Sequence, residues 1–307
     1  MGGLLRWLLI DRVMRPPPPD PASTALPVST PAFPTPRAAR DALLATWVGH
    51  ATFLLQIGGY NVLTDPMWGE RASPAAFLGP TRRVPPGIPL AALPPIDVVV
   101  QSHNHYDHLD DGTVRALVRR HQSAKWFVPL GVGRWLQARG VEAVAELDWW
   151  DQGAHGPLTL TCAPAQHFSA RGLADRNRTL WCSWTIAAAR RRVYFGGDSG
   201  YHPEFSLIGE RCGPFDAVLL PIGAYEPRWF MKPVHMNPEE AVAAFRELTH
   251  PRGAGDLATF VAMHWGTFKL TDEPLDEPPR RVRAAWHSAG LPPERLWVPA
   301  HGETRVW

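Results

Sequence analysis

Three histidines and an aspartate lie within six consecutive positions of this 307-residue chain, in the order His103, His105, Asp107, His108. The apolar run 96–100 precedes them and indicates a buried strand, and the pattern after them predicts a helix. The cluster should therefore occupy a loop at the carboxyl end of a strand, where α/β folds place binding sites. Imidazoles and a carboxylate at this spacing favour a metal site, with zinc preferred and iron or manganese as alternatives.

One loop does not complete a site for two ions, and three more ligand-type residues follow later predicted strands. They are His167 after residues 158–162, Asp198 after residues 193–195 and His264 after residues 260–263. The two glycines before Asp198 let the backbone approach an ion closely. Because strand ends meet at one edge of a sheet, we expect these side chains to join the first cluster.

From about residue 46 the chain mixes short β-rich runs with helical patterns and shows no internal repeat. Strands are expected at 46–48, 53–57, 62–64, 97–101, 125–128, 158–162, 181–187, 193–195, 217–220, 260–263 and 296–298. Helices are expected at 112–121, 132–139, 238–248 and 280–289. This mixture predicts one α/β domain over residues 41–307.

Residues 1–40 differ from the rest in composition. Nine of the 33 prolines lie between Pro16 and Pro36, and proline at this density prevents helices and sheet ladders. We therefore predict a Pro-rich N-terminal tail over residues 1–40, either disordered or serving as a weak membrane anchor. The anchor would be a short helix near the N-terminus, where apolar residues alternate with arginines.

Charge and hydrophobicity exclude several classes of protein. The net charge is +2, and the tail contributes +3 of it from five arginines and two aspartates, so the body sums to −1. A near-neutral body argues against nucleic acid as a partner. No apolar run reaches the roughly 20 residues that a transmembrane helix needs. The three cysteines are odd in number and show no Cys-x-x-Cys spacing, so a disulfide framework is not expected and a reducing compartment is favoured. We therefore expect a cytoplasmic or peripheral membrane protein.

The order His-x-His-x-Asp-His, then His, Asp and His, resembles the metallo-β-lactamase superfamily. The resemblance implies a four-layer αββα sandwich with two zinc ions at the edge between the sheets. The ligands that it implies are His103, His105 and His167 for one ion, Asp107, His108 and His264 for the other, and Asp198 as a bridge between them. True β-lactamases of this fold have cysteine at the bridging position, so Asp198 argues against antibiotic hydrolysis.

A more specific resemblance is to the N-acylphosphatidylethanolamine-hydrolysing phospholipase D family. It rests above all on the run 221–231, and further on the segments 46–52, 63–66, 71–74, 93–97, 146–150 and 264–268. The resemblance implies hydrolysis of N-acylphosphatidylethanolamine-like phospholipids at a membrane surface, to N-acylethanolamine and phosphatidic acid. A homodimer is a further expectation.

Individual residues receive roles from these patterns. His235 follows the run 221–231 and is expected to bind the substrate phosphate or transfer a proton, and Asp107 to act in catalysis besides binding metal. Candidates for orienting a ligand imidazole from behind are Asp65, His50 and Asp97. Candidates for binding the substrate are Tyr106 and, as walls of an acyl-chain groove, Trp229, Phe230 and Met231.

Two other functions remain open from the sequence. One is a metal-dependent lactonase or phosphodiesterase that acts on a small soluble substrate. The other is a lipid- or metal-binding protein that keeps the fold without catalysis. The complete set of ligand-type residues argues against the second reading.

Overall fold

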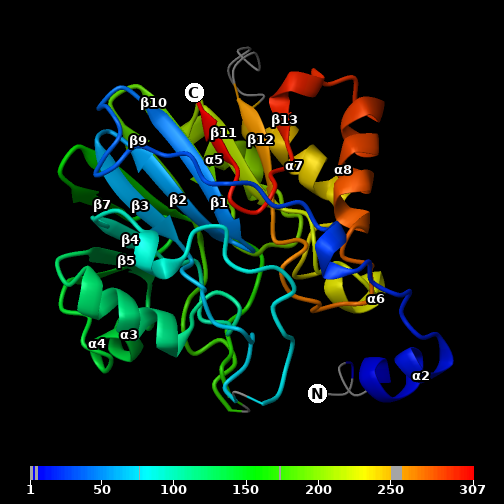
Figure 1. Ribbon diagram of the computed structural model, residues 1–307. Coiled ribbons are helices and arrows are strands. Elements are labelled where there is room, and N and C mark those ends of the chain that lie inside the picture. The colour runs from blue at the N-terminus through cyan, green and yellow to red at the C-terminus, as the bar shows by residue number, and fades with distance from the viewer. Residues whose placement is uncertain (1–2, 4–5, 76, 173, 250–257) are drawn as a thin grey trace.

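The computed structural model describes residues 3, 6–75, 77–172, 174–249 and 258–307. Within these residues two seven-stranded sheets face each other, and helices cover the outer face of each sheet (Figure 1). This arrangement confirms the predicted αββα sandwich.

The first sheet has the strand order β14-β1-β2-β3-β4-β5-β6. Its strands are β1 Leu43–Gly49, β2 Thr52–Ile57, β3 Tyr60–Thr64, β4 Val98–Val100, β5 Lys125–Pro129, β6 Val144–Leu147 and β14 Thr304–Val306. Side chains alternate between the faces, as in β5, where Phe127 points to the second sheet and Trp126 to the helices. The helices on this outer face are α3 Asp111–Arg120 and α4 Gly133–Gln137.

The second sheet has the order β13-β12-β11-β10-β9-β8-β7. Its strands are β7 Gln152–His155, β8 Leu158–Ala163, β9 Ser183–Ala188, β10 Arg191–Phe195, β11 Ala217–Pro221, β12 Thr259–Met263 and β13 Leu296–Trp297. Its outer helices are α5 Glu204–Cys212, α7 Pro238–Thr249 and α8 Glu277–Ser288, and the short α6 Arg228–Met231 follows β11. Buried side chains of both sheets and of α5, α7 and α8 form one continuous core.

Strand direction determines where the sites lie. Both β8 and β10 run antiparallel to β9, and β10, β11 and β12 are parallel to one another. The carboxyl ends of β8, β10 and β12 therefore meet at one edge of the second sheet. That edge is where the loops with His167, Asp198 and His264 begin.

The Pro-rich N-terminal segment lies against the body. It begins with a helical stretch, η1 Trp7–Asp11 and α2 Arg12–Met14, and continues as extended chain. Leu26 is buried, Val28 forms a bridge to His301, and Asp20 accepts a hydrogen bond from the Lys269 ammonium. Composition favours disorder here, but extended chain still buries single side chains and pairs its backbone. The boundary at residue 41 and the anchor role stay predictions.

Candidate metal centre

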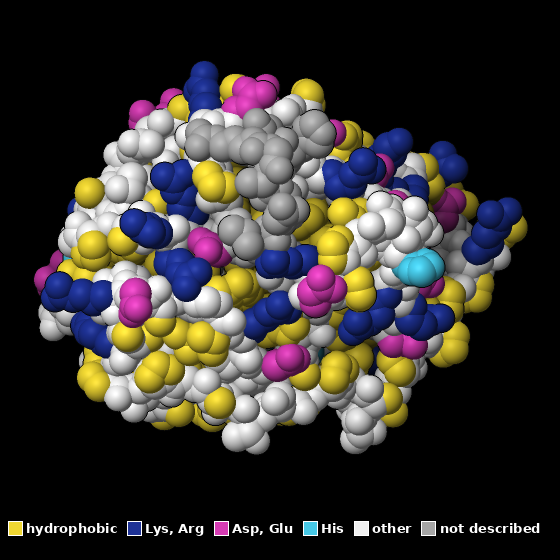
Figure 2. Space-filling view, turned by 90° about the horizontal axis from the view of Figure 1, so that it is seen from above, with side chains coloured by type: hydrophobic (Ala, Val, Ile, Leu, Met, Phe, Trp, Pro, Cys, Tyr) yellow, Lys and Arg dark blue, Asp and Glu magenta, His cyan; other side chains and the backbone are white. Residues whose placement is uncertain are grey.

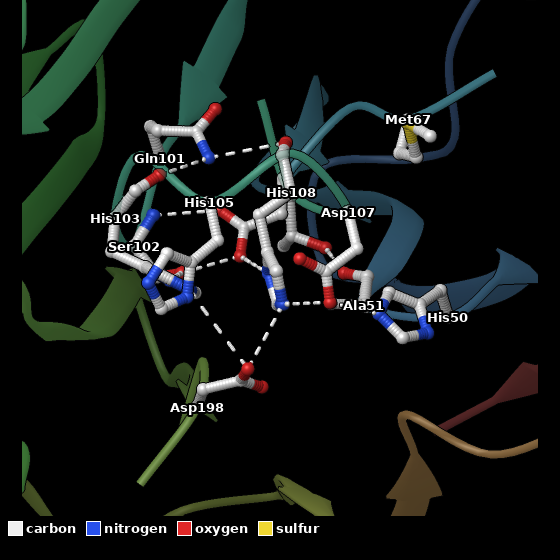
Figure 3. Close-up of polar contacts among 12 residues, drawn as sticks. His50, Ala51, Met67, Gln101, Ser102, His103, His105, Asp107, His108 and Asp198 are labelled. Carbon is white, nitrogen blue, oxygen red and sulfur yellow. Dashed lines mark hydrogen bonds and ion pairs between the residues drawn. The ribbon is translucent and has the colours of Figure 1, made fainter. Parts of the chain in front are cut away.

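The histidine-rich loop follows β4 and is held in a tight bend. The Gln101 amide donates hydrogen bonds to the carbonyls of His103 and His108, at 2.8 and 3.2 Å, inside the bend. From the other side, the Arg171 guanidinium donates to the carbonyls of Asn104 and Leu109, at 2.7 Å each. Figure 3 shows the side chains of the loop turned toward Asp198. The bend thus presents residues from one short segment to one common point.

Three imidazoles converge on one side of this point. The Nδ1 atom of His105 lies 2.9 Å from Nε2 of His103 and 3.2 Å from Nε2 of His167. Nitrogen ligands of a tetrahedral zinc ion, about 2.1 Å from the metal, lie roughly 3.4 Å apart, so a cluster of three imidazole nitrogens at this spacing suits one cation. The Nδ1–H of His167 donates to the Val234 carbonyl at 2.9 Å. This bond leaves the Nε2 lone pair of His167 directed at the common point.

A second group lies beside the first. Nε2 of His108 and Nε2 of His264 are 3.2 Å apart, and each is 3.5 Å from Oδ2 of Asp107. The spacing again fits three ligands of one cation, now two imidazoles and a carboxylate. Each group combines ligands from both sheets, because its other members lie in the loop after β4 of the first sheet, whereas His167 and His264 follow β8 and β12 of the second sheet.

Asp198 stands between the two groups. Its Oδ2 is 3.1 Å from Nε2 of His108, and its Oδ1 is 3.1 Å from Nε2 of His264. The same Oδ2 is 3.9 and 3.8 Å from Nε2 of His103 and His167. A single carboxylate thus reaches both groups. Its place depends on Gly197, which has φ +56° and where a Cβ would lie only 2.6 Å from the Ser102 Cβ.

The charge state of the buried cluster suits cations. Burial lowers the pKa of His105 to about 3 and holds those of His103 and His167 below their ordinary value, so these imidazoles are neutral ligands at pH 7. Burial alone would raise the pKa of Asp198, but the charge of His108 holds it well below its ordinary value. For Asp107, too, burial alone would raise the pKa, but the charge of His108 outweighs burial and holds the pKa well below its ordinary value, so the carboxylate is ionised. Two carboxylates enclosed among imidazoles require positive charge, which protons on His108 and His264 or divalent ions supply.

Asp65, one of the residues predicted to orient a ligand, lies behind the ligands. Its Oδ2 is 2.6 Å from Nδ1 of His108, which fixes that imidazole with Nε2 toward the centre. The same carboxylate accepts hydrogen bonds from the backbone N–H and the hydroxyl of Ser102. Because the Ser102 hydroxyl also contacts Nδ1 of His103, at 2.9 Å, one carboxylate orients one ligand in each group.

The two weaker candidates for this role differ. His50 is buried with Nε2 2.9 Å from Oδ2 of Asp107, so it lies against the second group. Asp97 precedes β4, whereas the ligand loop follows it, and Asp97 instead pairs with Arg37 and accepts a hydrogen bond from the Asn61 backbone. The prediction for Asp97 is therefore wrong, because it lies at the opposite end of the strand.

His235 lies next to the cluster. Its buried imidazole has Nε2 3.9 Å from Oδ2 of Asp198, and among the described residues its Nδ1 has no hydrogen-bond partner. Three consecutive carbonyls hold this segment: Pro233 accepts from Gln166, Val234 from His167, and His235 from Arg228 at 2.9 Å. A loop that carries one ligand, His167, therefore also fixes the position of His235.

The run 221–231 leads from β11 to α6, and a buried side chain from another segment holds its backbone. The buried carboxylate of Glu273 accepts hydrogen bonds from the backbone N–H groups of Ala224, Tyr225 and Glu226. Arg228, at the start of α6, also pairs with Glu240 at 2.6 Å. Sequence patterns did not identify Glu273, Gln166 or Arg171, because each acts on backbone atoms far away in the sequence.

The predicted substrate-binding residues separate into two places. Tyr106 lines a cavity of about 520 Å³ beside the loop and donates its hydroxyl hydrogen to the Arg171 carbonyl at 2.7 Å. Met231 is buried, whereas Trp229 is exposed. The Phe230 ring contacts Trp7 of the N-terminal helix, with centroids 5.5 Å apart. A substrate role for these residues stays a prediction.

Comparison with known proteins places this geometry in a family. Residues 60–265 match the model of the Beta-lactamase superfamily domain. An uncharacterized protein of Mycobacterium tuberculosis is 51% identical over 245 residues, which are 79% of this chain and 64% of that protein. An N-acyl-phosphatidylethanolamine-hydrolyzing phospholipase D 1 of Caenorhabditis elegans is 43% identical over 252 residues, 78% of this chain and 69% of that protein.

The fold agrees with that match. The solved structure of an isothiocyanate hydrolase from Delia radicum gut bacteria superposes with a TM-score of 0.66 and 21% identity, over 85% of this chain and 98% of that one. At this identity the likeness shows the fold alone. The chain therefore belongs to the Beta-lactamase superfamily, and it has the metallo-β-lactamase fold.

Proposed function

We propose that the protein is a metal-dependent phosphodiesterase of phospholipase D type. Its substrates would be N-acylphosphatidylethanolamine-like phospholipids, and its cofactors two zinc ions, with iron or manganese as alternatives. The observation that carries the proposal is the position of Asp198, whose carboxylate lies 3.1 Å from ligand nitrogens of the second group and within 3.9 Å of the first. One anionic side chain between two three-ligand groups supports a two-ion centre.

The relatives support the choice of substrate. The C. elegans relative is named for hydrolysis of N-acyl-phosphatidylethanolamine, and its 43% identity extends over most of this chain. True β-lactamases of this fold have cysteine at the position of Asp198. Aspartate there therefore favours hydrolysis of esters and argues against hydrolysis of β-lactams. The run 221–231, which carried the resemblance, ends directly before the segment with His235.

Residues of this chain have separable tasks in such a reaction. The ligands and the Asp65 carboxylate behind them hold fixed geometry for two cations. Divalent ions held there would lower the pKa of a water molecule and polarise a phosphoryl oxygen. His235 offers an imidazole at the edge of the centre that would bind the phosphate or donate a proton to the departing alkoxide.

The bonds that change define the test. Water adds its oxygen to phosphorus, the P–O bond to the N-acylethanolamine breaks, and the departing oxygen takes a proton. In ¹⁸O-labelled water the label should therefore enter phosphatidic acid and not N-acylethanolamine. Purified protein would be reconstituted with zinc and incubated with N-acylated phospholipids, ordinary phospholipids and lactones, with products analysed by mass spectrometry.

Variants separate this function from its alternatives. Asp198→Asn should lower turnover by orders of magnitude, whereas Asp97→Asn, at the opposite end of β4, should not. Hydrolysis of lactones or small soluble diesters alone would refute the phospholipid substrate. Lipid binding without turnover by the zinc-loaded protein would refute an enzyme.

A further inference from the structure

The large apolar side chains that are exposed cluster in three segments. Among the described residues there are eleven of them, and seven lie in the N-terminal helix, in the loop after residue 74 and in α6. These seven, which we call the apolar rim, are Leu9 (67% exposed), Ile10 (56%), Val13 (72%), Met14 (77%), Phe77 (78%), Leu78 (59%) and Trp229 (48%). Solvent exposure of so many large apolar groups in three short segments indicates a contact surface.

The N-terminal helix is docked with this side outward. Trp7 is buried, its indole N–H donates to Asp272 at 2.6 Å, and Arg12 pairs with the same carboxylate at 2.7 Å. Trp7 also contacts Phe230, and the Arg6 guanidinium lies over the Trp229 ring at 4.7 Å. These contacts fix the helix on α6 while Leu9, Ile10, Val13 and Met14 stay in solvent.

Two segments of the rim are next in sequence to residues that contact the loops of the candidate metal centre. Residues 69–71 and 73–75 line the same cavity as Tyr106 of the ligand loop, and Phe77 lies two positions after residue 75. The second segment, α6, carries Arg228, which donates to the His235 carbonyl. Figure 1 shows α2 and the cyan loop around residues 70–80 on the same side of the molecule, at its lower edge. The opposite face, in Figure 2, carries many charged side chains between its apolar ones.

We infer that the apolar rim docks on a lipid bilayer that contains anionic lipids, which brings the candidate metal centre to the membrane surface. The charge of the helix identifies this partner: residues 6–15 contain three arginines and one aspartate, a net +2, and Arg6 and Arg15 are exposed. Basic and apolar side chains on one short helix are typical of interfacial binding. Within the described residues no helix is both long and apolar enough to cross a membrane. Docking of the rim on a bilayer does not depend on the proposed function. Only the purpose of docking, to bring the metal centre to a phospholipid substrate, rests on it.

Flotation of the full chain with vesicles tests the inference. Phosphatidylcholine vesicles with phosphatidylglycerol should bind the wild-type protein, more weakly at high salt, and vesicles of phosphatidylcholine alone should bind it less. The double variant Leu9→Ser, Val13→Ser should bind at least about tenfold more weakly, because two inserted side chains are lost. Phe77→Ser with Leu78→Ser should weaken binding similarly. The matched control is Val306→Ser, a side chain 63% exposed on β14, which should bind as the wild type does.

The controls keep two kinds of failure apart. All these variants should hydrolyse detergent-dispersed substrate as the wild type does, because none of the changed residues touches the metal centre. Binding to vesicles without hydrolysis in any form would refute the proposed function and support the rim. The inference would be overturned if the wild-type protein bound neither kind of vesicle. It would also be overturned if the two double variants of the apolar rim bound vesicles as tightly as the wild type does. The wild-type protein could instead form a dimer that does not bind vesicles. If the variant Leu9→Ser, Val13→Ser is then monomeric, the apolar rim is a contact between two copies of the chain, and the inference is refuted.

Discussion

Replacement of Asp65 by asparagine should weaken metal binding without touching a ligand. The Asp65 carboxylate accepts three hydrogen bonds: Ser102 N–H at 2.6 Å, the Ser102 hydroxyl, and Nδ1–H of His108 at 2.6 Å. An amide has one acceptor oxygen and an NH₂ group. At least one of the three donors would therefore face another donor in a buried site.

The size of the effect follows from these bonds. Loss of one bond and of the negative charge in the other two should lower the free energy of unfolding by about 2–4 kcal/mol. Because His108 and, through Ser102, His103 lose their orienting partner, metal affinity should fall roughly 10–100-fold. That range corresponds to about 1.4–2.8 kcal/mol of binding free energy.

The assay is competition for zinc with a chromophoric chelator, combined with thermal denaturation of the metal-free protein. Asp97→Asn is the matched control, because Asp97 has the same side chain but pairs with Arg37 at the other end of β4. It should change unfolding by at most about 1 kcal/mol and leave zinc affinity unaltered. Wild-type zinc affinity in Asp65→Asn, or an equal loss in Asp97→Asn, would refute the reasoning.

Three further predictions concern His235, Arg228 and His202. His235→Gln should lower kcat by about 10²–10⁴-fold with metal content intact, measured by steady-state kinetics and elemental analysis. Arg228→Gln, which removes the donor to the His235 carbonyl, should lower kcat up to about a hundredfold, whereas Arg281→Gln on α8 should not. His202 is buried against Phe205 and burial lowers its pKa to about 4 from an ordinary value of 6.5. The unfolded chain thus takes up a proton first, and stability should fall by roughly 3 kcal/mol as pH drops from 6.5 to 4. His202→Leu should flatten that fall in urea titrations, and an unchanged slope would contradict the assignment.

The sequence predicted those parts of the fold whose signals are local. Strands with continuous apolar runs, such as β4, β11 and β12, lie where they were expected, and candidate ligands follow the ends of β4 and β12. The strands β6, β7 and β14 were missed. None of the four residues of β7 is buried, and β14 is three residues long and pairs with β1. Their formation depends on neighbours that are distant in the sequence.

The site was predictable in its ligand-type residues and less so in what supports them. Periodic spacing and strand ends gave His103, His167 and Asp198, because each lies in a local pattern. Asp97 was misassigned because a strand's direction relative to the site is a property of the sheet. Arg171 and Glu273 have no local signal, since they bind backbone carbonyls and amides of segments 47 residues or more away.

The central claim is that Asp198 lies between two bound cations. Anomalous-scattering crystallography at the zinc edge, on protein loaded with zinc, tests it most directly. The account predicts two peaks about 3.5–4 Å apart, one beside His103, His105 and His167 and the other beside Asp107, His108 and His264, with Asp198 in contact with both. A single peak, or peaks remote from Asp198, would contradict it.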